Sequence, residues 1–154
     1  MPAIGVGFRG PDGNPGYLLR QAHQTFRSAM EAALREIGVT SSQYSILSVI
    51  EVESGCSGAE LARDAVMTEQ SASELVAGLE KVGLIQRSRG SADRRIRHIN
   101  LTAAGQEALD QATPRIRALE SQMLEGLTEA ERDQLRTWLA RAAVRLSHTR
   151  VDVA

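Results

Sequence analysis

The sequence has few aromatic residues, one cysteine and almost no lysine. Aromatics make up 3% of the 154 residues, so a core must be built from aliphatic side chains. Cys56 has no second cysteine to pair with, which excludes an intramolecular disulfide. Lys81 is the one lysine among 18 basic residues, and the arginines that take its place favour bidentate contacts with phosphates and bases.

Long hydrophobic runs are also missing. No stretch approaches the ~18 apolar residues that a membrane-spanning helix requires, and the N-terminus lacks the basic start and apolar run of a signal peptide. We therefore expect a cytoplasmic protein with no membrane partner. The length suits one domain with a modest core, and the pI near 6.3 argues against a protein that is basic all over.

Residues 82–102 contain the one strongly basic stretch. Two short apolar segments flank a Gly/Ser/Asp loop, a pattern that predicts a β-hairpin. Five arginines and one aspartate lie between Arg87 and Arg97, so the tip presents positive charge to an anionic partner such as a phosphate backbone. A solvated turn with neutralising neighbours is the alternative. The candidate contact residues are Arg87, Arg89, Asp93, Arg94, Arg95 and Arg97.

Apolar residues that recur every three or four positions predict helices on both sides of the hairpin. They cover residues 17–37, a stretch from the Thr40 cap to about residue 54, a short stretch after 57, residues 69–82, and two long regions after 102 and 128, the first broken or bent at Pro114. Capping-box patterns beginning at Thr40, Ser57 and Thr128 mark three helix starts. The Gly/Pro-rich residues 1–16 predict a flexible arm, and residues 148–154 a C-terminal tail.

The short helix and the helix at residues 69–82 form a helix-turn-helix pattern. The inner face of the second helix is predicted to hold Ala72, Leu75, Val76, Leu79 and Val82. The opposite face is small and polar, so the floor of a DNA groove could approach it closely. This face holds Gln70, Ser73, Glu74, Ala77 and Lys81. The candidate DNA contacts of the helix and its cap are Thr68, Gln70, Ser71, Ser73, Glu74 and Lys81, with capping and solvation of an ordinary helix as the alternative. Adenine is the favoured target of Gln70, because a glutamine amide can contact the adenine edge bidentately.

Five fragments stand in register along the chain: Thr40-x-x-Gln43, Glu60-Leu61-Ala62, Leu79-Glu80-Lys81-x-Gly83-Leu84-Ile85-x-Arg87, Asp93-x-Arg95 and Leu101-Thr102-x-x-Gly105. Together they resemble the multiple-antibiotic-resistance regulator (MarR) family over roughly residues 17–146. The resemblance implies a mainly α (α+β) fold with a winged helix-turn-helix lobe at residues 40–102 and a helical dimerisation region at 17–39 and 103–147. It implies a homodimer on a pseudo-palindromic operator in double-stranded DNA.

In such proteins the residue matching Asp93 shapes the wing and the residue matching Arg95 contacts DNA. The resemblance also implies a cleft for small, anionic or phenolic effectors. Candidates for this cleft are His23, Phe26, Met30 and Tyr44, with core or interface packing as the alternative. Glu74 and Gly78 depart from the family pattern, because many members carry basic residues on the recognition helix. Glu74 could accept from a cytosine amino group, be repelled by phosphate or pair with a neighbouring arginine. Family-average operator preferences therefore do not transfer.

No enzyme, metal site or cofactor is expected. The histidines at 23, 98 and 148 lack metal-ligand spacing, and no nucleophile, base and orienting group can be assembled. The favoured function is a sequence-specific DNA-binding regulator, a repressor released by a small effector. The alternatives are a regulator that senses redox state through Cys56, and a winged-helix architectural or protein-interaction module without sequence specificity.

Overall fold

The computed structural model describes residues 2–89 and 97–147. Its elements in chain order are the 3-10 helix η1 (Gly7–Arg9), α1 (Pro15–Leu34), α2 (Ser41–Val52), α3 (Gly58–Asp64), α4 (Glu69–Lys81), β1 (Ile85–Arg89), β2 (Arg97–Leu101), α5 (Ala103–Met123) and α6 (Glu129–Ser147). Contacts divide the chain into Met1–Leu119, here unit 1, and Glu120–Ala154, here unit 2. The mainly helical fold with one hairpin confirms the predicted fold class.

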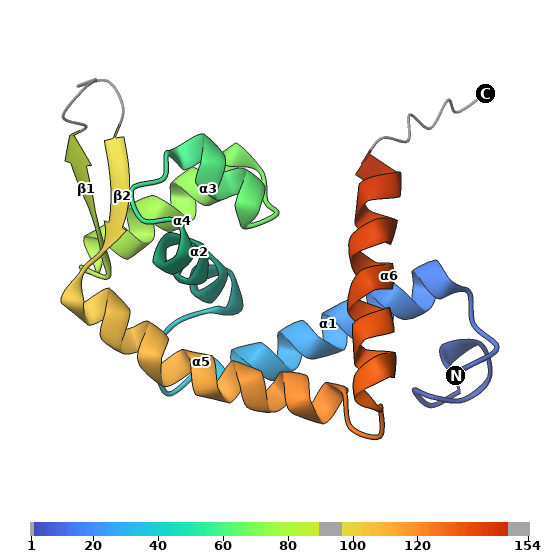
Figure 1. Ribbon diagram of the computed structural model, residues 1–154. Helices are drawn as coiled ribbons and strands as arrows, with labels where there is room; N and C mark the ends of the chain where they lie inside the picture. The colour runs from blue at the N-terminus through green and yellow to red at the C-terminus, as the bar shows by residue number, and fades with distance from the viewer. Residues whose placement is uncertain (1, 90–96, 148–154) are drawn as a thin grey trace. The chain divides into compact units, whose positions relative to one another are not determined.

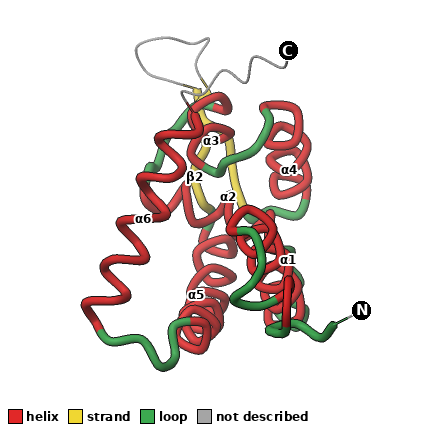
Figure 2. The backbone as a smooth tube through the Cα atoms, turned by 90° about the vertical axis from the view of Figure 1, so that its right-hand side faces the viewer, coloured by secondary structure: helices red, strands yellow, loops and turns green. Residues whose placement is uncertain are grey.

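Unit 1 contains a winged helix-turn-helix lobe. Helix α2 packs against β2, and α4 packs against α3 and β1, so the three helices gather beside the hairpin (Figures 1 and 2). The core is aliphatic, as the composition predicts. Its buried hydrophobic residues are Leu34, Val39, Ile46, Leu47, Ile50, Cys56, Leu61, Ala62, Ala72, Val76, Leu79, Ile85, Ile99, Leu109, Ala112 and Ile116.

The three predicted capping boxes are all formed. In each box the hydroxyl of the cap residue accepts a hydrogen bond from the backbone N–H of the residue three positions later. The side chain of that residue accepts in turn from the backbone N–H of the cap residue, so two otherwise unpaired donors are satisfied. The pairs are Thr40 with Gln43, Ser57 with Glu60, and Thr128 with Glu131. These boxes explain why α2, α3 and α6 begin where they do.

Helix α1 begins at Pro15, two residues before the predicted start, because proline suits the first helical position. It ends at Leu34, earlier than predicted. Residues 2–14 form turns and η1. They contact α1 through a reciprocal pair in which Arg9 Nε donates to Gln21 Oε1 at 3.2 Å and Gln21 Nε2 donates to the Arg9 carbonyl at 3.1 Å. Flexibility of this arm stays a prediction.

Helix α5 joins the lobe closely at its first turn. Thr102 Oγ1 donates to the Gly83 carbonyl and accepts from the Gly105 N–H. A Cβ at Gly105 would lie 1.9 Å from the Leu84 carbonyl oxygen, so only glycine fits there. This contact is the physical reason for the Leu-Thr-x-x-Gly fragment.

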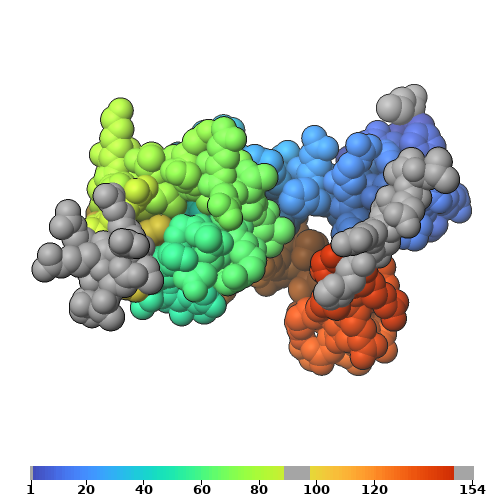
Figure 3. Space-filling model, turned by 90° about the horizontal axis from the view of Figure 1, so that it is seen from above, coloured from blue at the N-terminus to red at the C-terminus, as the bar shows by residue number. Residues whose placement is uncertain are grey.

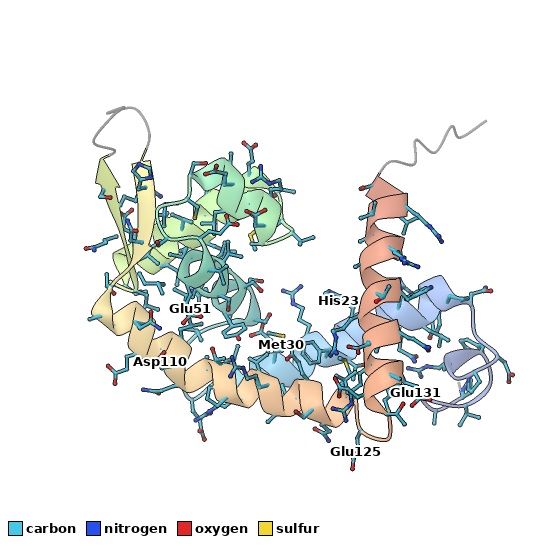
Figure 4. All side chains as sticks on the ribbon, in the orientation of Figure 1. His23, Met30, Glu51, Asp110, Glu125 and Glu131 are labelled. Carbon is cyan, nitrogen blue, oxygen red and sulfur yellow. The ribbon has the colours of Figure 1, made fainter. Side chains whose placement is uncertain are left out.

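Further along α5, Gln106 Nε2 donates to Glu51 of α2 at 3.1 Å and to Asp110 at 2.9 Å, and Figure 4 shows these two carboxylates near each other. Arg115 Nη1 donates to the Ala33 carbonyl at 2.9 Å, near the C-terminal end of α1. Of the predicted break or bend at Pro114, the break is wrong, because α5 runs through it as one helix, and the bend stays a prediction. Pro114 and Asp110 are both exposed, so the carbonyl that proline leaves without a donor can bond water.

Unit 2 comprises the last residues of α5 and helix α6. None of its described residues is buried. The exposed apolar side chains of this unit are Met123, Trp138, Leu139, Val144 and Leu146. Within a single chain, α6 therefore has no hydrophobic core of its own.

Candidate nucleic-acid interface

The turn between α3 and α4 is held by backbone hydrogen bonds. Met67 N–H donates to the Ala62 carbonyl at 3.0 Å and Val66 N–H to the Arg63 carbonyl at 3.1 Å, the two bonds of a Schellman motif. Val66 has φ +55° and is 91% exposed. A β-branched residue in this left-handed conformation is strained, because its Cβ crowds the following carbonyl. Thr68 then caps α4 by accepting from the Ser71 N–H.

Helix α4 buries one side and exposes the other. Ala72, Val76 and Leu79 are buried and Leu75 is half-buried, as predicted. The prediction for Val82 is wrong: the helix ends at Lys81, and Val82 is 65% exposed at its C-cap. The candidate DNA contacts Thr68, Gln70, Ser71, Ser73, Glu74 and Lys81 are all exposed, and α3 and α4 form a continuous surface in the view of Figure 3.

Hydrogen bonds order part of this outer face. Gln70 Nε2 donates to Glu74 Oε1 at 3.2 Å, and Thr68 Oγ1 donates to Ser71 Oγ at 2.9 Å. The exposed acidic residues of α4 are Glu69, Glu74 and Glu80, and its one basic residue is Lys81 at the last position. This helix therefore offers hydrogen-bonding groups but little attraction for phosphate.

The hairpin is antiparallel, with Ile85 opposite Leu101 and Arg87 opposite Ile99. Ile85 and Ile99 are buried and anchor it to the lobe. The last pair in the backbone register is Arg89 with Arg97. The wing candidates Asp93, Arg94 and Arg95 lie outside the described residues.

Arg87 is turned toward the lobe. Its Nε lies 3.3 Å from Glu80 Oε2 on α4, and the side chain is 27% exposed. It also lines a hollow of about 270 Å³ with residues of α3, α4 and β2. The ion pair connects the end of α4 with β1, so Arg87 is placed to hold the wing against α4, a role that the charge count alone does not indicate.

Cys56 extends the hairpin by one bridge. It pairs antiparallel with Ile99, and the side chain is 6% exposed. Burial raises the pKa of the Cys56 thiol, and nearby carboxylates add to the increase. Beside it, His98 Nδ1 contacts the Gly55 carbonyl oxygen. No sequence pattern indicates the contact between His98 and Gly55, because the two residues are 43 positions apart.

A cleft of about 410 Å³ lies between α1, α2 and the α3–α4 turn. It is lined by the predicted His23, Phe26 and Met30, and by Arg27, Ser41, Ser42, Ser45, Ala65, Val66, Met67, Ser71 and Leu75. Figure 4 shows His23 and Met30 along α1. The predicted Tyr44 is absent from this lining and packs against the core. Arg27 and the three serines were missed, although Arg27 follows His23 by one helical turn.

Glu31 of α1 does not line the cleft but bonds one of its serines. The Ser41 hydroxyl and the Ser41 N–H both donate to Glu31 Oε1. The side-chain bond is the main reason why the pKa of Glu31 lies below its ordinary value, and Arg27 contributes to the same decrease. The polar groups that line the cleft are therefore the His23 imidazole, the Arg27 guanidinium and serine hydroxyls.

Two other features are absent from the part of the chain that the structure describes. No three His, Cys, Asp or Glu side chains gather there in a way that could hold a metal ion. None of the helices within the described residues combines the length and apolar character needed to span a membrane.

Comparison with known proteins gives consistent matches. The model of the MarR family matches residues 37–96. An HTH-type transcriptional repressor of Mycobacterium tuberculosis is 30% identical over 124 residues, which cover 80% of this chain and 89% of the relative. The repressor CouR bound to a 23-mer DNA duplex is 26% identical with a TM-score of 0.77, covering 84% and 92% of the two chains. CouR from Rhodococcus jostii RHA1 bound to p-coumaroyl-CoA is 28% identical with a TM-score of 0.76, covering 89% and 94%.

An exposed polar helix beside an arginine-rich hairpin, on a winged-helix lobe, defines a DNA-binding transcription regulator of the winged-helix class. With relatives at this identity and coverage, the chain belongs to the MarR family. Members of this family are transcription regulators and not enzymes.

Proposed function

We propose that the protein is a homodimeric repressor that binds a pseudo-palindromic operator in double-stranded DNA and is released by a small anionic effector. The observation that carries this proposal is the exposed polar face of α4 beside the basic hairpin. In each protomer α4 enters a major groove and the wing reaches a flanking minor groove. The half-sites then lie one helical turn, about 34 Å, apart.

The two DNA-binding elements have different tasks. The outer face of α4 carries the acidic residues Glu69 and Glu74, and Lys81 is its one basic residue. Because this face attracts phosphate little, its contribution is the choice of DNA sequence. Arg89, Arg94, Arg95 and Arg97 of the wing supply most of the attraction for phosphate. CouR, a relative whose structure contains a DNA duplex, supports DNA as the partner.

The cleft between α1, α2 and the α3–α4 turn is the proposed effector site. Arg27 and the Ser42 hydroxyl suit a carboxylate, because the hydroxyls of Ser41 and Ser45 already donate to Glu31 and to the Ser41 carbonyl. Phe26 and Met30 suit an apolar ring or chain. An occupant would contact both α1 and the turn that holds α4, so it could favour one arrangement of the recognition helices over another. CouR bound to p-coumaroyl-CoA supports a small anionic ligand.

Thiol sensing is the weaker candidate. A reactive cysteine needs an accessible thiol with a lowered pKa, whereas Cys56 is buried and its pKa is raised. Cys56→Ser should therefore keep the response of the repressor to its effector.

Genome-wide footprinting followed by gel-shift titration tests the main proposal. We expect a discrete footprint, and Arg95→Ala should weaken binding severely. The slope of log K against log salt should become shallower by about 0.9 for each phosphate that the variant no longer neutralises. Uniform binding to unrelated duplexes would instead favour an architectural module.

The effector site is tested by titrating aromatic carboxylates into the operator complex. The wild-type protein should release DNA, and Arg27→Met should require a higher concentration of the same compound while its affinity for DNA stays unchanged. An unchanged midpoint for release would place the effector elsewhere.

A further inference from the structure

The hydrogen bond between Gln70 and Glu74 joins two candidate base contacts on the outer face of α4. Gln70 Nε2 is the donor and Glu74 Oε1 the acceptor, at 3.2 Å, across one turn of the helix. Both side chains are exposed. In the described part of the chain no ion pair engages Glu74, so the contact with Gln70 is the interaction that the structure gives this carboxylate.

This bond decides how the amide of Gln70 is oriented. An ionised carboxylate can only accept hydrogen bonds, so the amide nitrogen must face Glu74 and the carbonyl oxygen must face away. One N–H is used by Glu74, which leaves one N–H and the carbonyl oxygen. A bidentate contact with the major-groove edge of adenine requires that same set, with N–H toward N7 and C=O toward the N6 amino group.

The neighbouring polar residues are engaged differently. Thr68 and Ser71 bond each other, and Thr68 also accepts from the Ser71 N–H. These two hydroxyls therefore belong to the cap of α4, and Gln70 keeps open hydrogen-bonding capacity. Lys81 lies about two turns beyond Glu74 on the same helix, too far to neutralise it.

From these contacts we infer that Glu74 is a positioning residue, which holds the Gln70 amide in the orientation that selects adenine and contacts no base itself. This inference rests on the proposed function, because it requires α4 to lie in a major groove. The negative charge of Glu74 repels phosphate, so the residue lowers affinity for every sequence and raises discrimination between sequences. Glu74 thus accounts for an acidic residue on a DNA-facing helix.

Two substitutions separate the hydrogen bond from the charge. Glu74→Ala removes both, whereas Glu74→Gln removes the charge and keeps an oxygen that can accept from Gln70. Glu69→Gln is the matched control, because it removes one exposed negative charge from the first turn of the same helix and no bond to Gln70 is present there. Each protein is titrated at one salt concentration with the operator, with variants carrying every base at the positions facing α4, and with an unrelated duplex.

We expect the wild-type protein to prefer adenine at one position of each half-site by about five- to 150-fold, the range of a bidentate contact. Glu74→Ala should lose most of that preference and bind the unrelated duplex more tightly. Glu74→Gln should bind the unrelated duplex more tightly and keep the preference, and Glu69→Gln should also keep it. Gln70→Ala should lose the preference, with no further loss on adding Glu74→Ala.

Three outcomes overturn the inference. An unchanged preference in Glu74→Ala would show that the orientation of Gln70 does not depend on Glu74. A changed preference at a cytosine would make Glu74 a base contact. Loss of the preference in Glu74→Gln as well would assign the effect to charge. If the wild-type protein shows no sequence preference at all, the proposed function fails as well as the inference. If it shows a preference that Glu74→Ala leaves unchanged, only the inference fails.

Discussion

The two units of the chain differ in how they cover their apolar side chains. Every buried hydrophobic residue of the described structure lies in unit 1, between Leu34 and Ile116. Unit 2 has none among its described residues, although α6 exposes Trp138, Leu139 and Leu146. Unit 1 can therefore be stable by burial within one chain, whereas α6 gains hydrophobic stabilisation only by association. The difference supports the proposed homodimer, with α6 in its interface.

The largest effect should come from charging the apolar face of α6. Leu139→Glu places a carboxylate among the exposed apolar side chains and should convert the dimer to monomer in sedimentation at micromolar concentration. A monomer binds one half-site at a time, so operator affinity should fall by about 10²- to 10⁴-fold.

Ala140→Glu is the control for that change. Ala140 is the adjacent exposed residue, about 100° further around α6 and away from Leu139 and Leu146. This variant should remain dimeric. A Leu139→Glu protein that is still a dimer would place the interface away from this face.

A leucine-to-alanine change in unit 1 and one in unit 2 should lower the free energy of unfolding with different dependence on protein concentration. Leu79→Ala leaves a cavity at a fully buried site and should lower the free energy of unfolding by about 3–5 kcal/mol. That loss should be the same at every protein concentration. Leu139→Ala should destabilise less at low concentration, where the dimer dissociates, and more at high concentration. Urea unfolding at two concentrations a hundredfold apart measures both, and parallel behaviour would remove the distinction between the units.

Local features of both units could be predicted from the sequence. Capping boxes and helix faces depend on residues three or four positions apart, so Thr40, Ser57 and Thr128 marked the right helix starts. The outer face of α4 followed from the 100° rotation per residue in the same way. The candidate DNA contacts of α4 and its cap are exposed, as these signals predict.

Features that depend on distant residues could not be predicted. The bridge between Cys56 and Ile99, and the ion pair that turns Arg87 toward Glu80, require the folded lobe. Val82 continues the apolar stripe in sequence, but the helix stops one residue earlier, so periodicity assigned it to the wrong side. For Tyr44 both the cleft and core packing were open, and packing of α2 against the core agrees with the second.

Within unit 1, two helix ends share one motif and differ in one residue. Gly83 follows α4 and has φ +77°. Its N–H donates to the Glu80 carbonyl, and the Leu84 N–H donates to the Leu79 carbonyl. Val66 after α3 has the same pattern of two bonds and a positive φ. Since the left-handed conformation costs an L-residue about 1–2 kcal/mol and Val66 is exposed, Val66→Gly should stabilise unit 1 by about 0.5–1 kcal/mol after the entropy cost of glycine.

Gly83→Ala is the reverse experiment and should destabilise by about 1 kcal/mol. A Cβ at Gly83 would meet no atom within 4 Å, so backbone strain is the only cost. Both shifts should appear in thermal melts at every protein concentration, because neither residue lies in unit 2. Destabilisation by Val66→Gly would mean that the valine makes contacts in the dimer that outweigh its strain.

The smallest expected effect concerns pH and belongs to unit 1 alone. Because burial raises the pKa of the Cys56 thiol in the folded state, the unfolded chain loses this proton at a lower pH than the folded protein. The contribution of Cys56 to stability is therefore fully present below the unfolded pKa and decreases as pH rises through the folded pKa. Free energies of unfolding measured from about pH 7 to 10.5, a range that spans the ordinary thiol pKa, should fall more steeply for the wild-type protein than for Cys56→Ala, which has no thiol to titrate. Equal slopes, together with rapid labelling of the native thiol at neutral pH, would show that Cys56 is accessible and would restore the thiol-sensing alternative.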